Sequence, residues 1–156
     1  GRLDIGLIGE PHTMRNIGFY PLRNIEDIFV ATRNYLHILK MRGVERRQLL
    51  QNATLLLLDR ENMTRQYIDR YFQENHIVAQ DMIEVSNMDL LIEMSKISLG
   101  VGSVIRDFVQ NELKAGALVE IPLEIPLQKR EIGFAYKKFG KMSKALKQFI
   151  AFYEAY

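Results

Sequence analysis

The sequence contains no cysteine, and this absence removes two classes of structure at once. Without thiols the chain can form neither disulfides nor thiolate metal sites, and a reducing compartment is permitted. No apolar run approaches the ~20 residues that a membrane-spanning helix needs, and no signal peptide precedes Gly1. We therefore expect a cytoplasmic protein that does not contact a membrane.

The recurrent motifs of enzymes are also missing. There is no G-x-S-x-G, H-E-x-x-H, P-loop or G-x-G-x-x-G pattern, and Gly100-Val-Gly102 is too short to form a phosphate loop. The three histidines, His12, His37 and His76, are not spaced as metal ligands. We predict that the chain is not an enzyme and that it holds no metal ion or cofactor.

The chain carries little net charge, because 21 Lys and Arg stand against 19 Asp and Glu, a net of +2. Such a balance gives no overall field that would attract nucleic acid. A lysine cluster near the C-terminus suggests either a phosphate-binding patch or the solvated face of a helix. It comprises Lys137, Lys138, Lys141, Lys144 and Lys147. The solvated face is the favoured interpretation, because the opposite face of that helix is strongly apolar.

With 156 residues, of which 47% are hydrophobic, we expect a soluble globular chain that is able to bury a core. A strand–helix–strand unit is expected between Met82 and Arg106. Met82–Val85 is expected to be a strand, and Ser86-Asn87 is a helix N-cap signal. The helix that follows is apolar on nearly all sides, which predicts burial against more than one neighbour. Leu99–Ser103 is expected to be a second strand, parallel to the first, whose glycines let other backbone or a ligand come close.

The remaining periodicities outline an α/β chain on either side of this unit. Strands are expected at Leu3–Ile8, Phe19–Leu22, Ile25–Thr32, Thr54–Leu58, Leu118–Leu123 and Arg130–Tyr136. Helical segments are expected at Val44–Leu50, Met63–Asn75, Val104–Lys114 and at the C-terminus, where Leu146, Phe149, Ile150 and Tyr153 form one apolar stripe. Ala115-Gly116 is a helix C-cap signal. The apolar run Thr54–Leu58 is typical of a strand buried on both faces.

These segments, in this order, resemble the effector-binding domain of LysR-type transcriptional regulators. The matching stretches are Gly1-Arg-Leu-Asp-Ile-Gly-Leu-Ile8, Leu55-Leu-Leu-Leu58, Leu99-Gly-Val-Gly102 after its helix, Val104-Ile-Arg-Asp-Phe-Val109, Leu118-Val-Glu-Ile-Pro-Leu123 and Arg130-Glu-Ile-Gly-Phe-Ala-Tyr136. The resemblance covers essentially the whole chain. Ser98 departs from it, because the family usually has glycine at that helix end.

The resemblance implies a two-lobed α/β fold of the periplasmic-binding-protein-like type 2 class. In this fold two Rossmann-like subdomains are joined by two crossover strands. Residues 1–30 and 128–156 would form the first regulatory subdomain, which is expected to be incomplete, and residues 31–127 the second. The winged helix-turn-helix DNA-binding domain is expected to be absent from this chain.

The implied function is ligand sensing for a DNA-binding transcriptional regulator. A small-molecule effector would bind in the cleft between the lobes, and the change would reach DNA through a homodimer or homotetramer. DNA would be contacted by the missing N-terminal domain and not by this chain. The helix Met63–Asn75 is expected at the pairing surface, although its apolar stripe of Tyr67, Ile68, Tyr71 and Phe72 is equally consistent with packing on its own sheet.

The best ligand signal is the loop that leads into the helix beginning near Met63. Unpaired amides in the first turn of a helix attract a carboxylate or phosphate. Asn62 and Thr64 could add hydrogen bonds to a ligand or simply cap the helix, and both roles stay open. The loop after Ile8 is a second candidate, since ligands bind beyond the carboxyl ends of parallel strands. The candidate effector-binding residues are Gly9, Glu10, His12, Thr32, Arg33, Asn62, Met63, Thr64, Arg65, Asn87, Gly102 and Ser103.

The sequence defines the chemical class of the effector less well than it defines the candidate binding residues. Members of the resembled family that sense carboxylates place an arginine where this chain has Gly9-Glu10, so a charged fork would have to come from Arg33, Arg65 or the absent N-terminal part. Citrate or another organic acid is a candidate. A solute-binding protein of a transporter shares the fold but would carry a signal peptide or a lipid-anchor cysteine. A purely oligomerising domain would have an apolar, filled cleft, which the polar residues named above argue against.

Overall fold

The computed structural model describes residues 6–9 and 17–137 of the chain. The chain divides into two compact units, Gly1–Ile25 with Arg130–Tyr156 and Glu26–Lys129. The division falls at residue 25 rather than at residue 30, because the strand that follows Glu26 pairs within the sheet of the second unit. Glu10, His12, the terminal helix and the lysines from Lys138 onward lie outside the described residues.

The described part of the first unit is a three-stranded antiparallel sheet. Its order is β1 (Gly6–Gly9), β8 (Arg130–Lys137) and β2 (Ile17–Ile25), with β8 in the middle. Both outer strands run antiparallel to β8. The expectation that the first strand is parallel to a neighbour is therefore wrong for the described residues, because its only partner there returns in the opposite direction.

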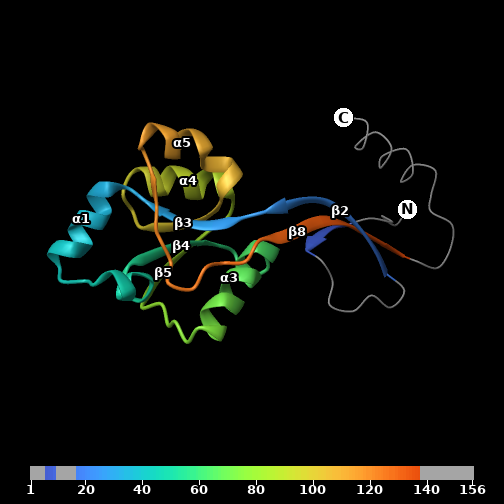
Figure 1. Ribbon diagram of the computed structural model, residues 1–156, viewed down its shortest axis with the longest axis horizontal. Coiled ribbons are helices and arrows are strands. Elements are labelled where there is room, and N and C mark those ends of the chain that lie inside the picture. The colour runs from blue at the N-terminus through green and yellow to red at the C-terminus, as the bar shows by residue number, and fades with distance from the viewer. Residues whose placement is uncertain (1–5, 10–16, 138–156) are drawn as a thin grey trace. The chain divides into compact units, whose positions relative to one another are not determined.

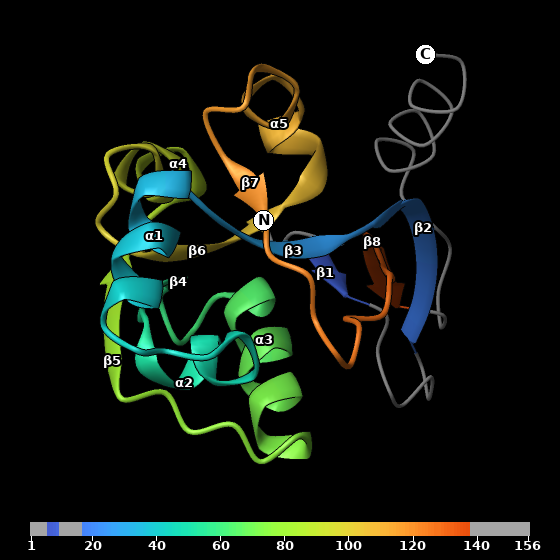
Figure 2. The ribbon, with the colours of Figure 1, turned by 60° about the vertical axis from the view of Figure 1, so that its left-hand side comes forward.

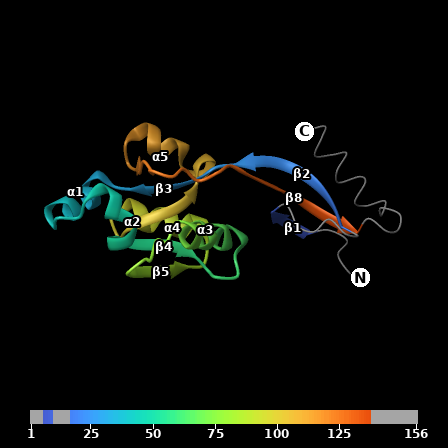
Figure 3. The same ribbon diagram turned by 60° about the horizontal axis from the view of Figure 1, so that its bottom comes forward.

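The second unit is built on a five-stranded mixed sheet with the order β5-β4-β6-β3-β7 (Figure 1). The strands are β3 (Asp27–Ala31), β4 (Thr54–Leu58), β5 (Asp81–Val85), β6 (Val101–Ile105) and β7 (Val119–Glu120). β4 is parallel to β5 (Figure 3) and to β6, whereas β3 is antiparallel to β6 and to β7. The expected strand–helix–strand unit is present, with β4 inserted between its two parallel strands.

Helices cover both faces of this sheet. One face carries α1 (Arg33–Met41), the short η1 (Arg46–Gln48) and α2 (Leu49–Asn52), and α3 (Met63–Glu74), with α2 beside α3 (Figure 2). The other carries α4 (Met88–Lys96), η2 (Arg106–Val109) and α5 (Gln110–Ala115). Leu55 and Leu57 of β4 pack toward α3, while Leu56 and Leu58 pack toward α4. This alternation confirms that β4 is buried on both faces.

One helix was not predicted, and one expectation about a helix is wrong. The segment Arg33–Met41, for which no structure was predicted, is a helix that buries Tyr35 and Leu39 against the sheet. The helix α4 buries one face only, and Leu90 and Ile97 are 47% and 67% exposed. The reason is position, because α4 lies on the outside of the sheet and no described element covers its outer side. No helix among residues 6–9 and 17–137 is long and apolar enough to cross a membrane.

Two tyrosines of α3 hold the segment that leaves the second unit. The hydroxyl of Tyr71 donates to the carbonyl of Ile125, and that of Tyr67 donates to the carbonyl of Gln128. Burial raises the pKa of Tyr71, and the neighbouring Tyr67 adds to the rise. Phe72 stacks on Phe29 of β3, with ring centroids 5.9 Å apart. The apolar stripe of α3 is thus used inside its own unit.

Two glycines set how closely β6 approaches its neighbours. A Cβ atom on Gly100 would lie 2.3 Å from the carbonyl oxygen of Thr54, which begins β4. A Cβ atom on Gly102 would lie 2.2 Å from Oγ of Ser95 and 2.9 Å from Cδ2 of Leu91, both on α4. The close approach expected of these glycines is confirmed, and for Gly102 the neighbour is a helix of the same unit.

We predict that Gly100→Ala lowers the free energy of unfolding by about 3 kcal/mol or more, because the clash is with backbone that cannot rotate away. Gly43→Ala is the matched control, since Gly43 has φ +82° with open space around it. It should cost only about 1–2 kcal/mol, the strain of a left-handed alanine. Chemical denaturation of both variants measures the difference, and equal losses would show that β6 tolerates displacement from β4.

Candidate functional site

The carboxyl ends of β4, β5 and β6 lie at one edge of the second sheet, because these three strands run in the same direction. The amino end of β3 lies at the same edge, since Asp27 pairs with Ile105. The loop after β4 returns into α3 at Met63, so the first turn of α3 also starts here. This edge, which we call the carboxyl edge, is the place where open α/β sheets bind ligands.

The N-terminus of α3 is capped by Asn62. Its Oδ1 accepts a hydrogen bond of 2.8 Å from the amide of Thr64. Capping is therefore one role of Asn62, and the partial positive charge of the helix end remains beside it. Thr64 is 9% exposed and Met63 is partly buried.

Arg65 is held inside the protein by four partners. Its guanidinium lies 2.8 Å from Oδ1 of Asp69, 2.8 Å from the carbonyl of Leu58, 3.4 Å from Oε1 of Glu84 and 3.1 Å from Sδ of Met82. The side chain is only 5% exposed. Because its charge is met by two carboxylates, Arg65 ties α3 to β4 and β5, and we leave it out of the proposed site.

Ser103 places a hydroxyl on the same face of the sheet as α3. It follows Val101 by two residues, and Val101 packs in the cluster that contains Ile68 of α3. Ser103 is 3% exposed, and its Oγ has no hydrogen-bond partner among the residues that the structure describes. A buried hydroxyl without a partner costs about 1–3 kcal/mol. Such a group is a ready site for a ligand's hydrogen bond.

Asp27 was not expected at this edge. It shares a face of β3 with Phe29, which pairs with Ser103, and it is 2% exposed. The signal in the sequence was a carboxylate at an inward position of an otherwise apolar strand, Asp27–Ala31. Its placement opposite Ile105, on the face of the sheet that carries Ser103, depends on the pairing of β3 with β6, which the sequence does not reveal.

Arg106 joins the two segments that flank the sheet at this edge. Its Nη2 lies 3.1 Å from Oε1 of Glu26 and 2.8 Å from Oε2 of Glu120, and its amide donates to the carbonyl of Glu26 at 2.9 Å. The hydrogen bond to Glu26 raises the pKa of Arg106, against the lowering effect of its partial burial, and Glu120 adds to the rise. Glu26 begins the second unit and Glu120 ends β7. One cation therefore fixes both segments.

The structure does not bring Thr32 and Arg33 to the carboxyl edge. They follow the carboxyl end of β3, which runs antiparallel to β6 and so ends at the opposite edge. Oγ1 of Thr32 accepts from the amide of Tyr35 at 3.0 Å and lies 2.6 Å from Oγ of Ser98. Ser98 has φ +66°, the left-handed conformation for which the family's glycine is suited. Arg33 is exposed at the start of α1.

The remaining predicted residues are separated from α3 in other ways. Asn87 caps α4, its Oδ1 accepting from the amide of Leu90 at 2.8 Å, and so lies on the other face of the sheet. Gly102 packs against Ser95 on that same face. Gly9 ends β1 in the first unit. Within residues 6–9 and 17–137 no group of three or more His, Cys, Asp and Glu side chains could hold a metal ion.

The sequence profile of the LysR substrate binding domain matches residues 1–156. The chain belongs to the LysR substrate-binding domain family. It is 26% identical over 151 residues to YeiE of Escherichia coli K12 and of O157:H7, each named an uncharacterised HTH-type transcriptional regulator. The match covers 96% of this chain and 50% of those proteins, so the chain spans half the length of these curated relatives.

Solved structures of LysR-family regulatory domains share the fold. The CcmR regulatory domain of Synechocystis PCC6803 in complex with 2-PG gives a TM-score of 0.77 at 14% identity, covering 97% of this chain and 72% of that one. The regulatory domain of MetR from N. meningitidis gives 0.75 at 14% identity, with 97% and 69% covered. The effector-binding domain of QuiR in complex with shikimate gives 0.70 at 18% identity, with 96% and 69% covered. The expected periplasmic-binding-protein-like fold is confirmed.

We predict that Ser103→Ala leaves the free energy of unfolding unchanged or raises it by about 1 kcal/mol, because it removes a buried hydroxyl that no described residue bonds. Thr32→Ala is the comparison, since that hydroxyl has two partners and caps a helix; it should cost about 0.5–2 kcal/mol. Urea denaturation of both variants without ligand measures the two changes in the free energy of unfolding. A loss for Ser103→Ala as large as that for Thr32→Ala would mean that its hydroxyl has a structural partner.

Proposed function

We propose that this chain is the ligand-sensing domain of a LysR-type DNA-binding transcriptional regulator, and that the carboxyl edge of its second unit binds a small-molecule effector. The observation that carries the proposal is the buried hydroxyl of Ser103 at the edge where α3 begins, which has no hydrogen-bond partner within residues 6–9 and 17–137. The binding residues are Asn62, Met63, Thr64 and Ser103, with Asp27 added from the structure. Gly9, Glu10 and His12 stay candidates from the first unit.

The effector is a small organic acid with hydroxyl groups. At the carboxyl edge an anionic group would be held by the N-terminal end of α3 and by hydroxyl and amide groups. The two arginines of this edge, Arg65 and Arg106, are engaged with carboxylates of the unit itself. Two structural relatives hold 2-PG and shikimate, which is consistent with small-molecule ligands in this family.

Binding changes DNA affinity because an effector favours whichever conformation binds it better. The segments fixed by Arg106, at Glu26 and Glu120, connect the second unit to the rest of the chain and would carry the change. DNA is contacted by a domain outside this chain, and the regulator acts as a homodimer or homotetramer, with the exposed side of α3 in the pairing surface. It works in the cytoplasm, away from membranes, and catalyses no reaction.

A transporter's solute-binding protein is the alternative with the same fold. The family match and the curated relatives, which are named as HTH-type transcriptional regulators, favour the regulator. The two functions also differ in a property that can be measured, because only the regulator changes its DNA binding when the effector is added.

The test is a thermal-shift screen of citrate, shikimate, 2-PG, amino acids and sugar phosphates. It uses this chain and the same chain extended to the length of its curated relatives. A true effector at 100 times its Kd should add about 2.7 kcal/mol of stability. Ser103→Ala should weaken its binding by about threefold to tenfold, the value of one hydrogen bond.

Ser95→Ala is the matched control, because Ser95 is also buried but belongs to α4, on the other face of the sheet, and donates to the carbonyl of Leu91 at 2.9 Å. It should leave effector affinity unchanged. Equal weakening in both serine variants, or no stabilising compound with the extended chain, would contradict the proposed site.

A further inference from the structure

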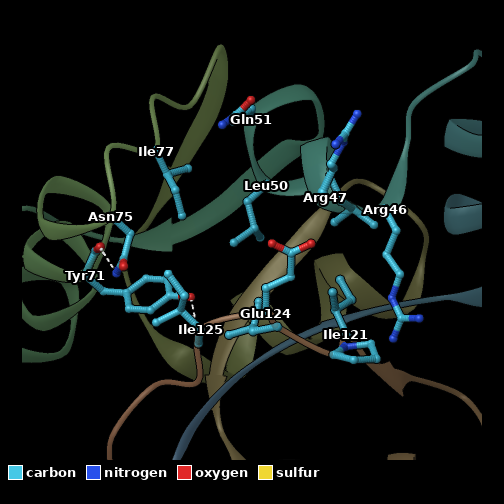
Figure 4. A pocket seen from close by; sticks show the side chains of 13 residues that line it. Arg46, Arg47, Leu50, Gln51, Tyr71, Asn75, Ile77, Ile121, Glu124 and Ile125 are labelled. Carbon is cyan, nitrogen blue, oxygen red and sulfur yellow. Dashed lines mark hydrogen bonds between the residues drawn. The ribbon is translucent and has the colours of Figure 1, made fainter.

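The second unit has two adjoining hollows that the carboxyl edge does not use. The larger, about 610 Å³, is lined by apolar side chains of α1, of the loop that follows it and of the segment after β7, among them Leu36, Leu39, Val44 and Ile121. The smaller, about 430 Å³, lies between α2, Tyr71 and Asn75 of α3, and residues 121–125 (Figure 4). Both volumes are within the range of small-ligand pockets.

These hollows are remote from the carboxyl edge. Asn75, which lines the smaller one, is eleven residues beyond Thr64 along α3, which corresponds to about 16 Å at 1.5 Å per residue. The larger hollow adjoins the smaller one on the side of α1, with Arg46, Leu49, Ile121 and Pro122 lining both. A ligand there would not touch Asn62, Thr64 or Ser103.

The charges around the larger hollow favour an anion. Lys40 and Arg46 line it, and neither side chain has a hydrogen-bond or ion-pair partner among the residues that the structure describes. The one carboxylate of its lining, Glu45, is paired with Nε of Arg47 at 3.0 Å. The smaller hollow shares Arg46 and is also lined by Arg47, but Arg47 is the partner of Glu45. Glu124 points into the smaller hollow (Figure 4) and would repel an anion there, whereas Lys40 lines only the larger one. The positive charge is therefore on the side of the larger hollow.

We propose that the larger hollow is a second ligand site, and that it takes a small amphipathic carboxylate. The apolar body of the ligand packs on Leu36, Leu39 and Ile121, which removes apolar surface from water. The carboxylate lies at the rim and accepts hydrogen bonds from the guanidinium of Arg46, a geometry that arginine provides better than lysine. Lys40 adds a second positive charge.

The probe is octanoate, below its critical micelle concentration, measured by calorimetry and by methyl NMR of the chain. We expect saturable binding that shifts the methyl signals of Leu36, Leu39, Val44 and Leu49 and leaves those of Leu91 and Leu113, on the other face, unmoved. Arg46→Ala should weaken binding by about tenfold or more, the range of a charge-assisted hydrogen bond. Octanol, with the same apolar body and no charge, should bind about tenfold more weakly than octanoate.

Arg33→Ala is the matched control, because Arg33 is an exposed arginine of the same region that lines neither hollow. It should leave octanoate binding unchanged, and so should Ser103→Ala, which separates this site from the proposed effector site. Equal losses in the two arginine variants, octanol binding as tightly as octanoate, or shifts confined to Leu91 and Leu113 would each overturn the proposal.

Discussion

The close approach of β6 to its neighbours is the constraint on which the second unit depends. Gly100 brings the start of β6 against the backbone of Thr54, and Gly102 lets α4 lie on the strand. These contacts fix the parallel register in which Leu55 faces Val101 and Leu56 faces Gly102. The next residue, Ser103, is thereby placed at the carboxyl end of β4, where the chain turns back into α3. The position of the candidate site therefore depends on the absence of a Cβ atom at Gly100 and Gly102.

The two arginines at the carboxyl edge hold elements of the second unit together. Arg65 holds α3 to β4 and β5, and Arg106 holds Glu26 and Glu120, so each guanidinium is met by carboxylates of its own unit. The groups proposed to meet a ligand are the N-terminal end of α3 and the hydroxyl of Ser103, which has no partner among the residues that the structure describes. Positive charge that no described residue pairs lies instead beside the larger hollow, at Lys40 and Arg46. The two places would therefore select different chemistry in their ligands.

Local signals predicted local structure well. The strand Thr54–Leu58 has the expected bounds, α3 ends within one residue of its expected end, and Asn62, Asn87 and Gly116 are the helix caps that their residue types indicated. Each of these features depends on neighbours in sequence, which is why a single chain reveals them. The helix α1, Arg33–Met41, was missed because its apolar stripe is short and follows directly on the strand signal that ends at Thr32.

The site was predicted less well, because its assembly depends on strand direction. Thr32 was expected at the edge of the cleft, which would require β3 to end where β4 and β6 end. The antiparallel pairing of β3 with β6 reverses this, bringing Asp27 to the carboxyl edge and Thr32 to the other. Likewise, no local pattern showed that Arg65 is enclosed by Asp69, Glu84 and the carbonyl of Leu58. Pairing between distant segments decided both outcomes.

The central claim is that the first turn of α3 and Ser103 together bind the effector, and amide hydrogen exchange tests it most directly. The organic acid that stabilises the protein most would be added, and exchange compared across α3. The account predicts added protection at the amides of Met63, Thr64 and Arg65, none at the last turn near Glu74, and loss of that protection in Ser103→Ala. Protection spread evenly along α3, or unchanged by Ser103→Ala, would contradict it.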